Sequence, residues 1–287
     1  MGAVLTFLST LFVFSVVNGT PLLYGTLGEI LTEKSGNMNL GVEGILFMGG
    51  AAGLGGAFYY EKLAGANASP FVALLLAVFF AFLAGALASL LFSFITITLR
   101  ANQNVTGLAL TTFGVGVGNF FGGSLAKLTG SGVSSISLTA TSNCFRTELP
   151  FADKLGWFGT IFLSHSFLAY VAVIIALIAA YVLRRTRVGL HLRAVGENPA
   201  TADAAGINVG RYKYLSTCIG SMIAGLGGLY YVMDYACGVW SNDAFGDRGW
   251  LAIALVIFAV WKPDFGILGS LLFGGLYIVH NYIQNLG

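Results

Sequence analysis

The chain has 287 residues, of which 56% are hydrophobic and 9% are charged, with a net charge of +2. Soluble domains carry about 25% charged residues, and a soluble fold of this composition would expose large apolar patches. The small net charge and the absence of a broad basic patch exclude a nucleic-acid-binding surface. The composition therefore predicts a protein that lies in the lipid bilayer.

Long uncharged runs show how the chain crosses the membrane. No Asp, Glu, Lys or Arg occurs in 63–99 or in 155–183, and a helix needs roughly 20 apolar residues to span the hydrocarbon layer. The runs do not alternate as barrel strands do, and backbone groups in lipid must bond within their own segment. We expect an all-α, polytopic transmembrane helix bundle of about eight spans, forming a single transmembrane domain over 1–287. The expected spans are 3–31, 42–60, 70–98, 105–127, 157–183, 213–233, 248–261 and 266–284.

The first span contains Pro21 near its middle, within the sequence Asn18-Gly19-Thr20-Pro21. A proline inside a helix removes one hydrogen bond and kinks the helix. The segment is therefore either one tilted helix or two short pieces hinged at this site.

Polar residues gather between the first two spans, in the stretch LGEILTEKSGNMNLGVEG from Leu27 to Gly44. Its glycines make a continuous helix doubtful, and irregular backbone at membrane depth occurs where it lines a cavity or is buried in protein. We favour a broken helix near 32–44 that places Asn37, Asn39 and Glu43 beside a translocation pathway. The alternative is an ordinary cytoplasmic loop followed by a helix start.

Asparagines continue this polar pattern in and beside the 105–127 span. A pathway for a polar solute requires weakly polar side chains inside the bundle, and such residues in a membrane segment are functional candidates. Together with one arginine discussed below, the expected pathway residues are Asn37, Asn39, Glu43, Asn102, Asn104, Asn119 and Arg248.

The loop 184–213 holds much of the positive charge of the chain. Its basic residues are Arg184, Arg185, Arg187, Arg193, Arg211 and Lys213. Positive loops stay on the cytoplasmic side, so we place 184–213 in the cytoplasm. Alternation along the chain then puts 128–156, 234–247 and the N-terminus outside, and the turns at Lys34, Arg100 and 261–264 inside.

A short helix is expected within this cytoplasmic loop, from 198 to 205. Asn198 suits the N-cap, Pro199 suits the first helical position, and Gly206 suits the residue after the helix. A short surface helix between basic arms is typical of a docking element.

The two halves of the chain share a short pattern. Gly41-Val42-Glu43-Gly44 and Gly246-Asp247-Arg248-Gly249 each precede an apolar run, and on our topology the two runs point in opposite directions. Inverted repeats place a pathway at their interface. We therefore expect two inverted halves in which Glu43 and Arg248 lie near the pathway or anchor one half each.

Three cysteines, Cys144, Cys218 and Cys237, form no CxxC pair, so no metal site is expected. Cys144 and Cys237 fall in loops expected outside, where they are either bonded to each other or free thiols. The chain has no phosphate-binding G-x-x-x-x-G-K-[ST] loop, so we expect no catalytic residues and no ATP bound by this chain.

Three stretches carry a resemblance to a known family: LGEILTEKSGNMNLGVEG, LRANQNVTGLAL from Leu99 to Leu110, and GLHLRAVGENPATADAAGINV from Gly189 to Val209. The chain resembles the permease subunits of type II ATP-binding cassette (ABC) importers for branched-chain amino acids, ribose and nucleosides, nearest the nucleoside branch. The resemblance extends from about 22 to 282. Members usually carry one further membrane helix beyond the point where this sequence stops.

The resemblance implies a multi-pass subunit of the bacterial cell membrane that works with several partners. These are a second, homologous permease, two cytoplasmic ATPase subunits that bind ATP and Mg²⁺, and an extracellular substrate-binding lipoprotein. It also implies that the segment around 196–206 is a coupling helix seated on the ATPase. The coupling residues would be Gly196, Glu197, Asn198, Pro199, Asp203 and Gly206.

Two alternatives remain open from the sequence. Within the same class, the substrate could be a sugar or a branched-chain amino acid instead of a nucleoside. An ion-coupled secondary transporter would need ionisable residues inside its spans, and the spans hold only Glu29, Glu43 and Asp234 near their ends. A lipid-modifying membrane enzyme lacks a catalytic constellation.

Overall fold

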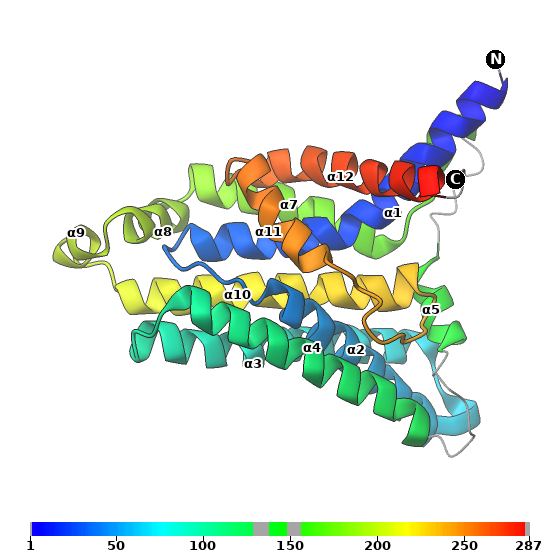
Figure 1. The fold of residues 1–287 in the computed structure, drawn as a ribbon, viewed down its shortest axis with the longest axis horizontal. Helices are drawn as coiled ribbons and strands as arrows, with labels where there is room; N and C mark the ends of the chain where they lie inside the picture. Colours follow the sequence, from blue (N-terminus) through cyan, green and yellow to red (C-terminus); the bar gives the residue numbers. More distant parts are fainter. Residues whose placement is uncertain (1, 129–137, 148–155, 285–287) are drawn as a thin grey trace.

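A computed structural model describes residues 2–128, 138–147 and 156–284, which form helices joined by turns (Figure 1). Much of the expected external loop 128–156 lies outside these residues. The helices are α1 (Gly2–Glu33), α2 (Val42–Ala64), α3 (Pro70–Ser93), α4 (Gln103–Leu128), α5 (Thr139–Phe145), α6 (Gly156–Phe162), α7 (Phe167–Arg185), α8 (Arg187–Glu197), α9 (Pro199–Ala204), α10 (Val209–Tyr230), α11 (Arg248–Phe258) and α12 (Pro263–Gln284). Short π-helical turns extend α3 over Phe94–Thr98 and α10 over Tyr231–Tyr235.

Six of the described helices are long and apolar enough to cross a membrane, and α11 and α12 contribute two shorter apolar segments. The long helices lie roughly along one axis, and the ends of the bundle differ (Figure 1). One end, the α9 end, carries α8, α9 and the turns at 34–41, 99–102 and 259–262. The other end, the α5 end, carries both termini, α5, and the turn between α2 and α3. This distribution agrees with the alternation expected from the sequence.

The helices pack as two inverted halves. α1 packs most extensively on α10 and α12, whereas α10 packs on α1 and α3. α2 lies against α3 and α10, whereas α11 lies against α12 and α1. Exchanging α1, α2 and α3 for α10, α11 and α12 therefore gives these same pairings, with the chain running in the opposite direction (Figure 1), whereas the packing of α2 on α4 has no counterpart among the described helices of the second half.

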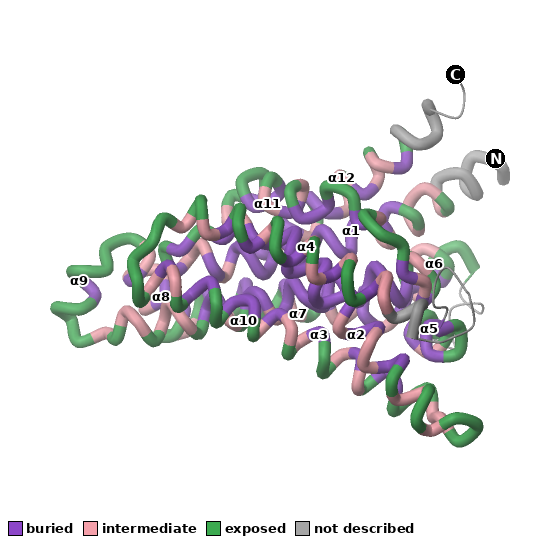
Figure 2. Tube along the Cα trace, turned by 60° about the horizontal axis from the view of Figure 1, so that its bottom comes forward, coloured by how far each residue is buried: buried purple, intermediate pink, exposed green. Residues whose placement is uncertain are grey.

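The core lies where the two halves meet, along α1, α2 and α10 (Figure 2). Glycines allow the close approach of α2 and α10, because a Cβ atom at Gly50 would lie 2.9 Å from the carbonyl oxygen of Gly228. Such contacts are the main source of helix association in lipid. Tyr24 is fully buried, and its hydroxyl donates a hydrogen bond of 2.7 Å to the carbonyl of Leu168.

Three expectations about the spans change. The first segment is a single helix that contains Pro21 and bends along its length (Figure 1). The expected span 157–183 is wrong as one helix, because it divides into α6 and α7 around Ser164-His165-Ser166. The His165 ring lies 2.8 Å from the Ile161 carbonyl, and the Tyr170 hydroxyl donates to the Phe162 carbonyl at 3.0 Å, so side chains contact the last carbonyls of α6 at the break.

The expected span 248–261 is also too long. α11 ends at Phe258, and Val260 and Trp261 turn the chain with positive φ angles of 51° and 52°. α11 begins inside the bundle instead of at its edge (Figure 1), so it is a half-helix. An 11-residue helix is about 16 Å long, roughly half of the hydrocarbon thickness.

The possible disulfide between Cys144 and Cys237 is not formed, and all three cysteines are free thiols. Cys237 has a positive φ of 55°, and its sulfur accepts a hydrogen bond of 3.3 Å from the Arg146 guanidinium. The backbone turn thus directs this thiol toward an arginine.

Candidate functional site

The interruption between α1 and α2 is the first part of the site. α1 ends at Glu33, and residues 34–41 return the chain into the bundle before α2 begins at Val42. The Asn39 N–H donates to Glu29 Oε1 at 2.7 Å, and the Gly41 N–H donates to Asn39 Oδ1 at 2.9 Å. Glu29 and Asn39 are both 1% exposed. Their side chains therefore pair backbone N–H groups that would find no hydrogen-bond partner in lipid.

The same segment is bonded to α4 and α10. The Asn37 amide donates to Thr217 Oγ1 at 3.3 Å, and the Met38 N–H donates to Gln103 Oε1 at 2.8 Å. The Gln103 amide also reaches Asn37 Oδ1 at 3.5 Å. The sequence reasoning missed Gln103, although it lies between the two asparagines that were singled out.

The first turns of α2 and α11 meet inside the bundle. The Glu43 carboxylate accepts a hydrogen bond from the Gly249 N–H, at the positive end of α11. A Cβ atom at Gly249 would lie 2.6 Å from the Glu43 nitrogen, so glycine is needed for this approach. Glu43 is 3% exposed. Its hydrogen bond to the Gly249 N–H joins α2 of the first half to α11 of the second.

Arg248 is enclosed within the second half. Its guanidinium lies 4.7 Å from the ring centre of Tyr231, 5.2 Å from Tyr235 and 4.9 Å from Tyr277, and donates to the Phe245 carbonyl at 2.7 Å. Such cation–π contacts stabilise a desolvated cation. Arg248 therefore anchors α11 to α10 and α12, which is the second of the two roles expected for it.

The three asparagines of the α4 region lie on or near its exposed surface. Asn102 precedes α4, and its Oδ1 accepts the Val105 N–H at 3.1 Å. Asn104 is exposed, two residues further along the chain. Asn119 donates to Asp243 Oδ1 at 2.7 Å and accepts the Asp243 N–H at 3.2 Å, which links α4 to the segment before α11. Asp243 lies in an irregular loop and gave no sequence signal.

Among the described spans, α4 is much less buried than the other spans of similar hydropathy. Its mean hydropathy matches that of α1, α2 and α10, well below that of α3 and α7. Yet 28% of α4 is buried, against 83% of α2. The exposed residues of α4 are mixed, because Asn104, Thr112 and Gly116 lie among large exposed apolar side chains such as Leu108, Phe113 and Phe120. Polar groups in a membrane segment are functional candidates, so this side of α4 is a candidate surface for a pathway.

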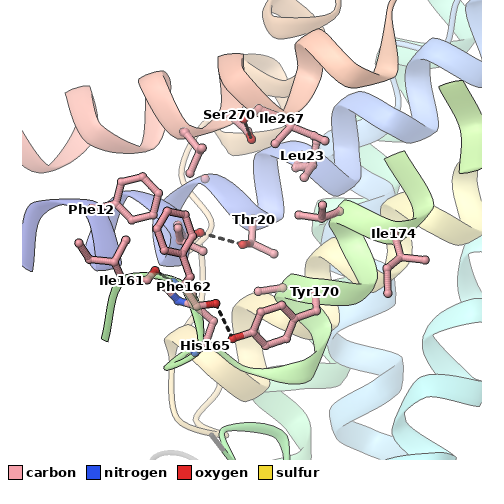
Figure 3. A pocket seen from close by; sticks show the side chains of 15 residues that line it. Phe12, Thr20, Leu23, Ile161, Phe162, His165, Tyr170, Ile174, Ile267 and Ser270 are labelled. Carbon is pink, nitrogen blue, oxygen red and sulfur yellow. Dashed lines mark hydrogen bonds between the residues drawn. The ribbon is translucent and has the colours of Figure 1, made fainter. Parts of the chain in front are cut away.

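The apolar hollows of the structure lie elsewhere. One of about 920 Å³ lies between α2, α3 and α4, and another of about 410 Å³ lies among α1, α6, α7 and α12 (Figure 3). Neither is lined by any of the expected pathway residues. The second has Thr20, His165, Tyr170 and Ser270 among otherwise apolar side chains, so neither hollow offers a continuous polar route.

α8 and α9 form the second part of the site, at the tip of the α9 end (Figure 1). Asn198 caps α9 by accepting the Thr201 N–H at 3.0 Å, Pro199 is its first residue, and Gly206 has a positive φ of 79°. Glu197 and Asp203 are exposed. The helix and its ends are therefore as the sequence predicted.

Gly196 joins this helix pair to the interruption between α1 and α2. A Cβ atom at Gly36 would lie 3.2 Å from Gly196 Cα, and Gly36 itself has a positive φ of 80°. Lys34 is half-buried beside this joint; burial lowers its pKa from the usual value, and nearby Arg193 acts in the same direction. Movement of α8 and α9 would thus act directly on the backbone that precedes Asn37 and Asn39.

Among the described residues, no group of three or more His, Cys, Asp or Glu side chains could hold a metal ion. The candidate site consists of hydrogen bonds, glycine contacts and polar surfaces.

Comparison with known proteins relates this arrangement to transporters. The sequence profile of the family described as "Branched-chain amino acid transport system / permease component" matches residues 11–286. The nucleoside ABC transporter permease protein NupC of Lactococcus lactis subsp. cremoris is 31% identical over 90% of this chain and 78% of its own length. The guanosine ABC transporter permease protein NupQ of Bacillus subtilis is 31% identical over 91% of this chain and 78% of its own.

A third relative has a different name. The putative glucose ABC transporter permease protein TsgC13 of Haloferax volcanii is 30% identical over 95% of this chain and 77% of its own length. No solved structure matches this chain significantly. The chain belongs to the branched-chain amino acid transport system permease family and is a cell-membrane permease subunit of an ABC importer, a class of subunit without ATPase activity.

Proposed function

We propose that this chain forms half of a translocation pathway for nucleosides, which an extracellular binding protein delivers and ATP hydrolysis in partner subunits drives. The observation that carries the proposal is the set of polar residues on the little-buried side of α4, namely the exposed Asn104 and Thr112 and the half-buried Asn119, on a span that is 28% buried. A second, homologous permease facing α4 would enclose a pathway without exposing these groups to lipid.

The basic loop and the helix pair supply the orientation and the drive. The positive residues of 184–213 place the α9 end in the cytoplasm, where Glu197 and Asp203 would contact an ATPase subunit. ATP and Mg²⁺ bind in that subunit. The Gly196–Gly36 contact then carries its movement into the interruption between α1 and α2.

Nucleosides are proposed because two of the three relatives above are named as nucleoside or guanosine permeases. The glucose name of the third relative and the family description leave a sugar and a branched-chain amino acid as competitors. An ion-coupled transporter stays the alternative of another class. Glu29 and Glu43 each accept a backbone N–H through one oxygen, whereas Glu43 Oε1 and Asp234 Oδ2 are buried without a hydrogen-bond partner among the described residues.

The test is uptake into proteoliposomes that contain the chain with its partner permease, its ATPase subunits and its binding protein. We expect ATP-dependent accumulation of labelled guanosine that unlabelled nucleosides reduce and that glucose or leucine does not. Competition by glucose or leucine instead would assign the alternative substrate. Uptake by the purified chain alone, without ATPase subunits, would contradict the mechanism.

Glu197→Arg is expected to abolish ATP-dependent uptake while leaving membrane insertion intact. The side chain is exposed on the tip of the helix pair, so its reversal disturbs docking instead of folding; surface substitutions usually change stability by at most about 0.5 kcal/mol. Co-purification of the ATPase subunit measures the effect. Asn67→Arg, at the exposed turn of the α5 end, is the control. Normal uptake by Glu197→Arg would remove the docking role.

A further inference from the structure

A separate hollow of about 540 Å³ lies beside the bundle at the α9 end, between α8 and the first turns of α10. Its lining includes Val188 and His191 of α8, and Asn208, Arg211 and Leu215 at the start of α10. Gly206 of the coupling segment also borders the hollow, whereas none of the expected pathway residues lines it. A ligand bound in this hollow would be separate from the transported substrate.

One face of α10 changes from cationic at Arg211 to apolar at Leu215, both of which line the hollow, and stays apolar at Ile219, which lies beyond the lining. Arg211, Leu215 and Ile219 follow one another at intervals of four residues, which aligns them on a single helix face. Leu215 is 50% exposed and Ile219 is 49% exposed. With a rise of about 1.5 Å per residue, Arg211 lies nearer the α9 end than Leu215 by roughly 6 Å and nearer than Ile219 by roughly 12 Å.

The polar end of the hollow is built to face an anion. Arg211 is exposed, and the structure gives its guanidinium no ion pair within the described residues. The Tyr212 hydroxyl lies 2.9 Å from His191 Nδ1 on the same wall. Arg184, by contrast, is already paired with Asp264 at 2.5 Å, so it does not contribute free positive charge.

α8 continues the same amphipathic surface. Val188 and Leu190 are 55% and 56% exposed, and Arg187 is exposed beside them. Exposed apolar side chains next to arginines are typical of a helix that lies in the headgroup region of a bilayer.

We propose that this hollow binds an anionic phospholipid of the cytoplasmic leaflet, with its phosphate at Arg211 and His191 and its acyl chains along Leu215 and Ile219. Charge complementarity and the depth of the two apolar side chains favour a lipid over a protein loop, because a loop from the ATPase would leave Leu215 and Ile219 uncovered. Basic pockets beside membrane helices on the cytoplasmic side hold lipid headgroups in this way.

The test compares lipid binding by the full chain in nanodiscs that contain phosphatidylglycerol mixed with phosphatidylcholine. Lipids that remain bound after extraction into detergent are counted by native mass spectrometry. We expect enrichment of phosphatidylglycerol in the wild-type chain and a loss of roughly fivefold in that enrichment in Arg211→Gln. Arg211→Lys keeps the charge and should keep most of the enrichment, whereas Leu215→Gln should weaken retention of both lipids.

Arg100→Gln is the matched control, because Arg100 is an exposed arginine at the same end of the bundle, on the turn between α3 and α4. Equal enrichment in the wild type and in Arg211→Gln would overturn the proposal. So would displacement of the bound lipid by millimolar inorganic phosphate, which would identify a site for the free anion. Loss of ATPase co-purification in Arg211→Gln with unchanged lipid enrichment would assign the hollow to the ATPase instead.

Discussion

Replacing Glu43 with alanine is expected to lower the free energy of unfolding by about 1–3 kcal/mol, the cost of leaving a buried hydrogen-bonding group without its partner. The group left without a partner is the Gly249 N–H at the start of α11. The substitution also removes the negative charge that lies at the positive end of that helix. Denaturant-induced unfolding of the purified chain measures the change in stability, and uptake should fall with it because α2 and α11 join the two halves.

Two further variants separate the hydrogen bond from the loss of charge. Glu43→Gln keeps a carbonyl oxygen that can accept the same N–H, so it should lose less stability than the alanine variant. Asp247→Asn removes an exposed carboxylate beside the same helix start, where no side-chain cap bond is formed, and should change stability by at most about 0.5 kcal/mol. Equal effects of Glu43→Ala and Asp247→Asn would show that the contact between the halves contributes nothing.

Substituting Gly196 with valine is expected to reduce ATP-dependent uptake at least about tenfold. A tenfold loss corresponds to about 1.4 kcal/mol in the free energy of the coupling step. The ATPase subunits should still bind. A Cβ atom at Gly196 would lie 3.1 Å from the Gly36 nitrogen and against the Lys34 carbonyl. Backbone cannot move away as a flexible side chain can, so α8 and the 34–36 turn must separate. The measurement is the ratio of substrate transported to ATP hydrolysed in proteoliposomes.

Gly210→Ala is the control for this prediction. A Cβ atom there would meet only the Asn208 side chain, at an ordinary contact distance of 3.7 Å, so the ratio should stay at the wild-type value. An unchanged ratio in Gly196→Val would mean that the two glycines merely pack and that motion reaches the pathway by another route.

Local signals explain which parts of the fold could be predicted from the sequence. The uncharged runs fix the helical spans, because lipid leaves the backbone few alternatives. The interruption at 34–41 and the helix α9 were also predictable, since glycine spacing and the Asn198-Pro199 cap act within a few residues. These features depend little on what packs around them.

The remaining features depend on tertiary contacts. The break between α6 and α7 lies at Ser164-His165-Ser166, inside a run without charged residues, so a search for uncharged runs alone did not reveal it. Arg248 was expected from its repeat position either near the pathway or as an anchor of one half, and its partners Tyr231, Tyr235 and Tyr277 come from α12 and the end of α10, which no local pattern indicates. The state of the Cys237 thiol depends on a backbone turn and on Arg146.

The candidate pathway shows the same division. Asn37 and Asn39 were predictable as polar residues in a membrane segment, whereas Gln103 and Asp243 became evident only through their hydrogen bonds. The exposed face of α4 needed both kinds of information, because its modest hydropathy is informative only when its low burial is known.

Labelling of single cysteines along α4 tests the central claim most directly. In the assembled transporter, with the native cysteines replaced, a hydrophilic thiol reagent should react with cysteine at Asn104, Thr112 and Gly116, where the structure leaves open space. Cysteine at Phe79, Leu83 or Leu87 of α3, whose side chains are 57%, 40% and 59% exposed, should stay unlabelled in lipid. Equal protection of the α4 and α3 positions would contradict the account, because it would place α4 in lipid and leave the pathway without its lining.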